Sequence, residues 1–289
     1  MFSDNILDTI GNTPMVKYTD NIFLKLENFN PSGSIKDRAS YNMIKSALER
    51  GEIDKDTVII EPTSGNTGVG IAMVCAVLGL KLIICMPESM SEERRKFISV
   101  FGAELVLTPA SEGMKGAVDK AFELKNIYSN SWIPMQFANP DNPKAHKQTA
   151  KEILNDTGRK VDIVVAGIGT GGTAFGLKEY LTGVQVYGVE PAESPLFTDG
   201  KAGPHKIQGI GANFIPEIAK NGKTLDGILT VEGDNAIEKA KELAKKHGIF
   251  CGISAGANVV AAEELAEKYP DKIIVAIIPD SGDRYLSVF

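Results

Sequence analysis

The chain of 289 residues contains only three cysteines, three histidines and no long apolar run, and each scarcity excludes a class of protein. The cysteines lie singly in apolar stretches, at Cys75, Cys85 and Cys251. An odd number without metal-like spacing predicts buried free thiols in a reducing compartment rather than a disulfide framework. The histidines form no H-x-x-H or H-x-x-x-H pair, so the sequence predicts no zinc site and no other metal site.

An excess of basic residues is also missing. The net charge of −6 and the isoelectric point near 5.3 argue against nucleic acid or an acidic membrane as the partner. The first residues contain no basic region followed by an apolar run, which argues against a signal peptide. The longest apolar stretches, 70–80 and 273–278, are too short to span a bilayer. We therefore expect a globular enzyme in the cytoplasm.

Short apolar strands and helices alternate along two parts of the chain. The first part covers 55–127 and the second begins at 161, with an irregular segment at 130–142 between them. A less regular portion, 193–230, precedes the last helices and the last strand. Such alternation is typical of a parallel sheet covered by helices on both faces. We predict an α/β fold with two lobes, each a mainly parallel sheet flanked by helices.

Three of the predicted strand-to-helix turns are rich in glycine, hydroxyl and amide groups: 62–68, 166–173 and 252–257. Ligands of open α/β sheets bind at the carboxyl ends of the strands, and anions prefer helix N-termini. The turns therefore predict sites for a phosphate or a carboxylate. The alternative is an ordinary turn in which Ser64, Asn66 or Ser254 caps the following helix.

The second of these turns has a competing interpretation. Gly167, Gly169 and Gly172 match G-x-G-x-x-G, and Glu190 follows about twenty residues later at a strand end. That pattern is typical of a dinucleotide site, so an NAD-dependent oxidoreductase is an alternative function.

One lysine lies where it could be activated. The polar loop 30–34 leads to Lys36 in the first turn of a predicted helix, 36–50, for which Ser34 is a candidate N-cap. The helix dipole disfavours a cation there, which could lower the pKa of Lys36 and make it a nucleophile. Most lysines at such positions are solvated surface groups, and that alternative stays open on this evidence alone.

Five segments together resemble one enzyme family. They are NPSGSIKDR (30–38), EPTSGNTG (61–68), QFANPDN (136–142), GTGGT (169–173) and GISAGA (252–257). Their order is that of the O-acetylserine sulfhydrylases, or cysteine synthases, which with cystathionine β-synthases are fold-type II pyridoxal-phosphate (PLP) enzymes. The similarity extends over 11–285, and the combination argues against the dinucleotide interpretation.

The resemblance implies a fold like that of the tryptophan synthase β subunit, in which the two lobes bind different groups. A smaller lobe, 36–140, would carry the substrate-carboxylate loop, and a larger lobe, 1–35 plus 141–289, would hold the phosphate and the pyridine ring of PLP. Lys36 would form the Schiff base and move the Cα proton. Asn66 would bind the 3′-oxygen of the cofactor, and Ser254 would face the pyridine nitrogen. The phosphate would be held by Gly169, Thr170, Gly171, Gly172 and Thr173.

The resemblance also implies a reaction. The residues that would bind the amino-acid substrate are Thr63, Ser64, Asn66, Thr67, Gln136, Gly209 and Asn213. A neutral serine beside the pyridine nitrogen favours β-elimination over transamination. The expected reaction converts O-acetyl-L-serine and sulfide into L-cysteine and acetate through an α-aminoacrylate.

Asn213 departs from the family pattern, because sulfhydrylases typically have glycine there and cystathionine synthases often an acid. The departure keeps an alternative open, in which L-cysteine is consumed to give hydrogen sulfide plus lanthionine, serine or cystathionine. A non-catalytic protein that acts on serine acetyltransferase is a further alternative. The family also implies a homodimer and a possible complex with serine acetyltransferase.

Overall fold

The computed structural model describes residues 2–220, 222 and 224–289, which form two compact units. Unit 1 contains the residues up to Ile10 together with Lys36–Asp141, and unit 2 contains Gly11–Ile35 and Asn142–Phe289. The division expected from the sequence differs from this one at residues 1–10 and at Asp141. Leu7 and Ile10 are buried in the core of unit 1, which explains why the first residues belong to it.

Unit 1 is built on a four-stranded sheet in the order β5–β4–β3–β6, in which every paired strand is parallel. The strands are β3 (Val58–Pro62), β4 (Lys81–Pro87), β5 (Glu104–Thr108) and β6 (Ser131–Trp132). The helices are α1 (Lys36–Glu49), α2 (Asn66–Leu78), α3 (Glu92–Ser99) and α4 (Gly113–Ile127), with short 3-10 turns η1 (Ile6–Thr9) and η3 (Ala110–Glu112).

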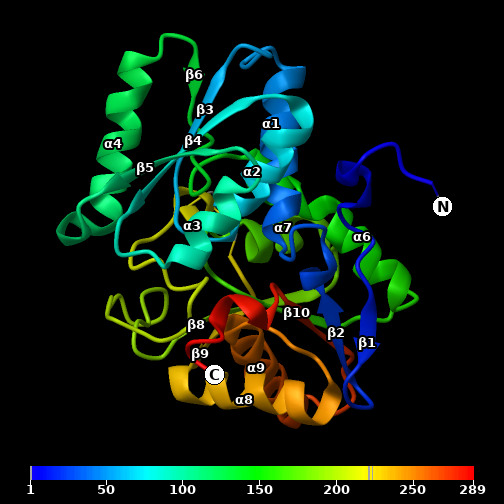
Figure 1. Cartoon of the computed structure of the whole chain (residues 1–289). Coiled ribbons are helices and arrows are strands. Elements are labelled where there is room, and N and C mark those ends of the chain that lie inside the picture. The colour runs from blue at the N-terminus through cyan, green and yellow to red at the C-terminus, as the bar shows by residue number, and fades with distance from the viewer. Residues whose placement is uncertain (1, 221, 223) are drawn as a thin grey trace. The chain divides into compact units, whose positions relative to one another are not determined.

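Both faces of the unit 1 sheet are apolar and covered by helices. On β3, Ile59 packs in the core beneath α1 and α2, whereas its neighbour Ile60 packs in the core beneath α4. Successive side chains of a strand point to opposite faces, so a continuous apolar run marks a strand buried on both sides. Figure 1 shows α4 on one side of this sheet and α1 and α2 on the other.

Unit 2 contains a six-stranded sheet in the order β1–β2–β10–β7–β8–β9, in which only the β1–β2 pair is antiparallel among the described pairs. The strands are β1 (Met15–Lys17), β2 (Ile22–Leu26), β7 (Ile163–Gly167), β8 (Gln185–Pro191), β9 (Gly227–Val231) and β10 (Ile274–Ile278). The helices are α5 (Asp141–Lys144, which begins at the boundary), α6 (His146–Asp156), α7 (Gly172–Tyr180), α8 (Gly233–His247) and α9 (Ile253–Lys268). Three 3-10 turns complete it: η2 (Glu27–Phe29), η4 (Glu217–Lys220) and η5 (Gly282–Tyr285).

The core of unit 2 likewise has two halves. Ile163 and Val165 of β7 face the cluster that contains α8 and α9, and Val164 faces the cluster that contains α6 and α7. The prediction of two mainly parallel, helix-covered sheets is therefore confirmed. It missed β6 and most of β9, which lie in the two portions expected to be irregular. The reason is that β6 has only two residues and β9 is only partly buried.

The three cysteines are buried and free, as the sequence predicted. Burial raises the pKa of Cys75 and of Cys251 to about 12, so these thiols stay protonated and unreactive. Among the described residues no cluster of metal-ligating side chains is found, and no helix has the length and apolarity needed to cross a membrane.

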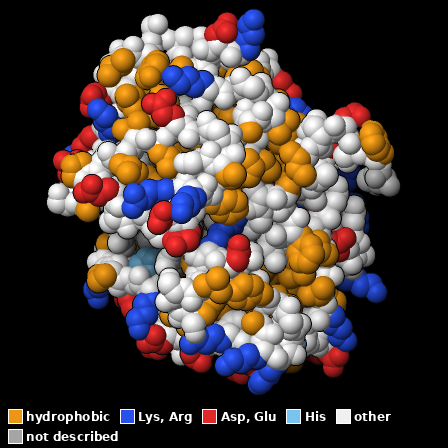
Figure 2. Space-filling view, viewed as in Figure 1, with side chains coloured by type: hydrophobic (Ala, Val, Ile, Leu, Met, Phe, Trp, Pro, Cys, Tyr) orange, Lys and Arg blue, Asp and Glu red, His pale blue; other side chains and the backbone are white. Residues whose placement is uncertain are grey.

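The visible surface carries charges of both signs next to one another. Figure 2 shows Lys and Arg side chains interspersed with Asp and Glu rather than gathered in one basic area. Exposed ion pairs of the i,i+4 type, such as Lys96–Glu92 and Lys115–Asp119, also bring opposite charges together on helix surfaces.

Candidate active site

In unit 1, the turn after β3 leads directly into the N-terminus of α2. Gly65 is the N-cap of this helix and makes no side-chain capping bond, so neither Ser64 nor Asn66 acts as the cap. The first turn of α2 contains no acidic residue. Backbone N–H groups at a helix start that lack a capping side chain suit an anion.

Two of the predicted substrate residues meet at this turn. The Thr67 hydroxyl donates to Oε1 of Gln136 over 2.6 Å, and both side chains are buried. Gln136 follows β6, which is paired with β3, so the sheet brings residues 69 positions apart into contact. Thr63 is also buried, and its hydroxyl accepts from the Gly65 N–H over 3.4 Å.

Lys36 is the first residue of α1 and is half-buried, unlike an ordinary solvated lysine. One turn later, the Ser40 hydroxyl donates to the Thr67 carbonyl over 3.5 Å, which joins the starts of α1 and α2. The two helices approach closely because residue 70 is glycine. A Cβ there would lie 2.7 Å from Ser40 Oγ. Lys36 is therefore placed at the same end of unit 1 as the α2 turn.

In unit 2, the glycine-rich turn after β7 leads into α7. Gly171 is its N-cap, with φ +84°, and the first turn has no acidic residue. The glycines are required by close approaches: a Cβ on Gly169 would lie 2.5 Å from the Gly209 carbonyl oxygen, and one on Gly172 would lie 2.0 Å from Asn142 Oδ1. Only glycine fits at these two positions, so the start of α7 is a glycine cradle of bare backbone.

Two residues that the sequence analysis did not select support this cradle. Asn142 donates from Nδ2 to Thr170 Oγ1 over 3.0 Å, and His146 Nε2 lies 3.2 Å from Thr173 Oγ1. Asn142 was part of a motif quoted above, which was the signal that could have identified it. Nothing in the sequence marked His146, because only folding brings α6 beside α7.

The third turn brings Ser254 near the same cradle. Gly252, not Ser254, is the N-cap of α9, so the capping interpretation of Ser254 is wrong. Ser254 is buried in the first turn, and its Oγ would lie 3.7 Å from a Cβ on Gly209. Gly209 thus lies between the glycine cradle and Ser254.

Asn213 lies farther along the loop that contains Gly209. Its backbone is left-handed, with φ +61°, a conformation that glycine and asparagine adopt most readily. Its Oδ1 accepts from the Ser194 hydroxyl over 2.7 Å.

The loop that precedes Lys36 is held by the C-terminal part of unit 2. The Ile35 N–H donates to the Pro279 carbonyl over 2.8 Å, and Arg284 donates from Nη1 to the Gly33 carbonyl over 3.0 Å and from Nη2 to the Ser32 carbonyl. Arg284 is a third residue that sequence reasoning missed, because nothing local relates residues 32 and 284.

Glu190 does not support the dinucleotide interpretation. Its buried carboxylate accepts from the N–H groups of Phe197 and Thr198 and from the Thr198 hydroxyl over 2.7–3.0 Å. A carboxylate used in this way to hold a loop is not available for a ribose.

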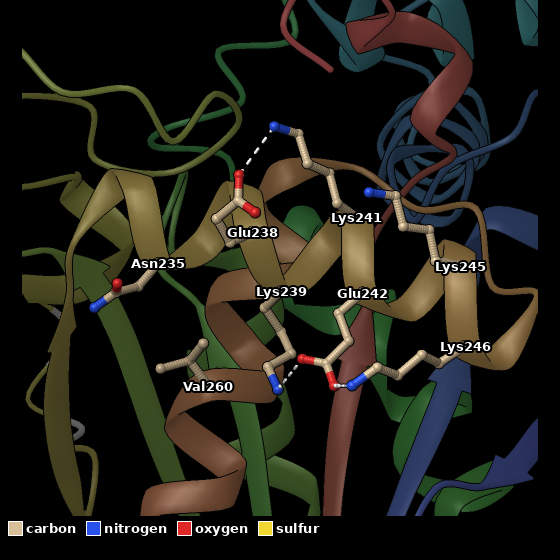
Figure 3. A pocket seen from close by; sticks show the side chains of 8 residues that line it. All are labelled: Asn235, Glu238, Lys239, Lys241, Glu242, Lys245, Lys246 and Val260. Carbon is tan, nitrogen blue, oxygen red and sulfur yellow. Dashed lines mark hydrogen bonds and ion pairs between the residues drawn. The ribbon is translucent and has the colours of Figure 1, made fainter.

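A hollow on the surface of α8 contains none of the predicted site residues (Figure 3). Its lining includes lysines paired with glutamates: Lys241 with Glu238 at 2.9 Å, and Lys239 and Lys246 with Glu242 at 2.8 and 3.0 Å. Because the positive charges are paired with negative ones, this hollow is a solvated helix face and not an anion site.

The fold and the two glycine-bearing turns at helix starts point to a class of enzyme. Residues 6–280 match the sequence profile of the family "Pyridoxal-phosphate dependent enzyme", and the chain belongs to that family. PLP is therefore its cofactor.

Three relatives show which enzymes of this family the chain is similar to. Cysteine synthase B of Campylobacter jejuni is 55% identical over 292 residues, which cover 98% of this chain and 97% of that protein. The crystal structure of an O-acetylserine sulfhydrylase (isoform 3) from Entamoeba histolytica matches with a TM-score of 0.95 and 41% identity, covering 100% of this chain and 91% of that one. A hydrogen sulfide-producing enzyme from Fusobacterium nucleatum matches with a TM-score of 0.93 and 45% identity, covering 99% and 100%.

Proposed function

We propose that the chain catalyses PLP-dependent β-replacement, in which O-acetyl-L-serine and sulfide give L-cysteine and acetate. The observation that carries the proposal is the pairing of Thr67 with Gln136 beside the N-terminus of α2, a built site for a carboxylate, in a chain whose α7 turn suits a phosphate. The names of the Campylobacter and Entamoeba relatives support the same reaction.

The residues of unit 2 fit PLP. The N–H groups and hydroxyls of Gly169, Thr170, Gly171, Gly172 and Thr173 would hold the phosphate, because a helix start without acids complements its charge. Ser254 would face the pyridine nitrogen, and its hydroxyl cannot supply the charge that a carboxylate would. When bound, PLP withdraws electrons from the substrate Cα.

The residues of unit 1 would act on the amino acid. Lys36 would form the Schiff base with PLP and afterwards take the Cα proton on Nζ and return it. Asn66 would bind the 3′-oxygen of the cofactor. The substrate carboxylate would be bound by Thr63, Ser64, Thr67 and Gln136.

An absorbance titration tests the proposal. The purified protein should be yellow, borohydride should attach the cofactor to Lys36, and O-acetyl-L-serine should change the visible spectrum before sulfide restores it. L-cysteine, L-serine and L-homocysteine are then titrated in turn to identify the leaving group and the nucleophile. A colourless protein to which borohydride attaches nothing would contradict the proposal.

A second candidate reaction consumes L-cysteine and releases hydrogen sulfide. It is favoured by Asn213, whose amide is held by Ser194 in the loop that contains Gly209, and by the name of the Fusobacterium relative. Rapid mixing decides between the two. A spectral change with O-acetyl-L-serine and none with L-cysteine would exclude the second candidate, and Asn213→Gly is expected to reduce any activity toward L-cysteine.

A homodimer, a complex with serine acetyltransferase and a cytoplasmic location stay predictions. Light scattering of the purified protein, alone and mixed with serine acetyltransferase, would test the first two. If Lys36→Ala left the biological role intact, a non-catalytic function would replace the one proposed.

A further inference from the structure

Unit 2 contains a buried carboxyl group to which the proposed reaction assigns no role. Asp280 lies two residues after β10, with 2% of its surface exposed. Its Oδ2 accepts a hydrogen bond of 2.5 Å from the hydroxyl of Tyr285, which is also buried. A phenol donates and a carboxyl oxygen accepts, so this bond directs Oδ2 at Tyr285 and leaves Oδ1 turned to the other side.

The other carboxyl oxygen of Asp280 lies against Gly252, the N-cap of α9. A Cβ on Gly252 would lie 2.1 Å from Asp280 Oδ1 and 2.6 Å from Tyr285 Cε2, so only glycine leaves room for the pair. The Gly252 N–H donates to the Asp280 carbonyl over 3.1 Å. Asp280 therefore contacts the N-cap through its backbone and through its side chain.

Gly252 connects this pair to the first turn of α9. Its carbonyl accepts from the N–H groups of Ala255 and Gly256 over 3.1 and 3.4 Å, which closes the turn. Ser254 lies within that turn and is buried. The position of Ser254 therefore depends on Gly252 and, through it, on Asp280.

Tyr285 belongs to a turn that is itself held in place. It is the last residue of η5, and its neighbour Arg284 donates from Nη1 to the Gly33 carbonyl over 3.0 Å. At the other end of η5, the Gly282 N–H donates to the Phe250 carbonyl over 3.4 Å. These bonds fix η5 at both ends, so the Tyr285 hydroxyl donates to Asp280 from a fixed position.

The Asp280 carboxyl also supplies a charge that the start of α9 lacks. The first turn of α9, which the structure describes in full, contains no acidic residue, and its N-cap makes no side-chain capping bond. A carboxylate close to such a helix start is favourable, because the N–H groups there carry partial positive charge. Replacing the carboxyl of Asp280 by an amide should therefore disturb the same turn.

We propose that Asp280 and Tyr285 are positioning residues for Ser254: the Tyr285 hydroxyl holds the Asp280 carboxyl against the N-cap of α9 and thereby fixes the turn in which Ser254 faces the pyridine nitrogen of PLP. The role rests on the proposed function, because the place of that nitrogen beside Ser254 is part of it. Neither Asp280 nor Tyr285 is assigned a contact with PLP or with the substrate. Removal of the Tyr285 hydroxyl should therefore act on PLP only through Ser254.

A double-mutant cycle on the holoenzyme tests this role. Tyr285→Phe, Ser254→Ala and the double variant are compared with the wild type by the rate of PLP loss on dialysis and by the visible absorption of bound PLP. Ser254→Ala removes one hydrogen bond and should speed the loss about 3–10-fold. Tyr285→Phe should speed it at least about twofold, by no more than Ser254→Ala does, and shift the absorption in the same direction. The double variant should equal Ser254→Ala in both measurements.

Tyr18→Phe is the matched control. The Tyr18 hydroxyl also donates to a carboxylate, Glu263 Oε1 over 2.8 Å, and Glu263 lies on α9, nine residues after Ser254. The control therefore removes the same kind of bond from the same helix, away from its first turn, and should leave PLP loss and absorption as in the wild type. If Tyr285→Phe changes as little as this control, or if its effect multiplies that of Ser254→Ala in the double variant, the inference is overturned.

A second variant covers the case in which Tyr285→Phe does not fold. Asp280→Asn keeps the shape of the side chain, but an amide whose oxygen accepts from Tyr285 turns its NH₂ group toward the start of α9. It should speed PLP loss when Ser254 is present and add nothing to Ser254→Ala. An effect that persists beside Ser254→Ala, or no effect at all, refutes the role of Asp280.

Two results separate the possible failures. If the wild type binds PLP but shows no spectral response to O-acetyl-L-serine or L-cysteine, the proposed function fails, whereas the cycle, which uses no substrate, still decides the role of Asp280 and Tyr285. If Ser254→Ala changes neither PLP loss nor absorption, the pyridine nitrogen does not lie at Ser254, and the role proposed for the pair fails with that placement.

Discussion

Lys25 provides a quantitative test of what stabilises unit 2. Its side chain is fully buried on β2, and its Nζ donates to the Thr13 carbonyl over 2.7 Å. The same Nζ lies 2.9 Å from Asp156 Oδ2 and 3.0 Å from Glu152 Oε2. Lys25→Met therefore removes the cation that two carboxylates, one turn apart on α6, share.

The loss in the free energy of unfolding depends on which of the two carboxylates can be rehydrated. The Asp156 side chain is 38% exposed and can turn to water, whereas that of Glu152 is 8% exposed and is also bonded to the Asn12 N–H over 2.8 Å. Removing one partner of a buried ion pair costs about 3–5 kcal/mol, chiefly because the other charge is stranded. The unfolding entropy of a 289-residue chain is about 0.6 kcal/mol per kelvin, so Tm should fall by about 5–8 °C.

Thermal unfolding followed by circular dichroism measures this effect. The double variant Lys25→Met/Glu152→Gln removes the buried negative charge as well. The amide oxygen of the new glutamine can still accept from the Asn12 N–H. At least half of the decrease in Tm should therefore be recovered. The control is Lys17→Met on the neighbouring strand, whose pair with Asp20 is exposed and should be worth less than about 1 °C. The reasoning is refuted if Lys25→Met loses no more than this control, or if the double variant is the less stable of the two.

Three more outcomes are expected. Lys36→Ala should fold with an unchanged Tm but retain no cofactor after borohydride and denaturation, as measured by mass spectrometry, and a retained adduct would place the Schiff base elsewhere. Gly172→Ala should lose PLP at least tenfold faster on dialysis, because its Cβ would overlap Asn142 Oδ1 at 2.0 Å, and adding Asn142→Ala should restore part of the retention. Burial raises the pKa of Glu61 to about 8, which means that the folded state keeps a proton that the unfolded state loses, so its contribution to the free energy of unfolding falls between about pH 4.5 and pH 8. Glu61→Gln lacks this loss, and its Tm relative to the wild type should rise by about 6 °C from pH 5 to pH 8; a difference that stays constant contradicts the assignment.

Local sequence determined most of the fold class and the positions of the glycine-rich turns. Apolar runs of four to six residues, separated by helices, specify parallel strands because both faces of such a sheet are covered. The turns 62–68 and 166–173 could be located because glycine and hydroxyl residues clustered between a strand and a helix are typical of an anion-binding turn. The start of α1 at Lys36 was predictable from its flanking loop, since Pro31 and Gly33 cannot continue a helix.

The tertiary structure alone decided what each turn touches. Gln136 was uninformative by itself, and pairing of β6 with β3 is what places it against Thr67. Arg284 lies 252 residues from Ser32, to whose carbonyl it donates, and no periodicity relates the two. Periodicity and turn chemistry act over a few residues, whereas strand pairing and burial act between residues far apart in the chain. For that reason the sequence located the candidate site, and the packing of the sheets determined which side chains hold its groups in place.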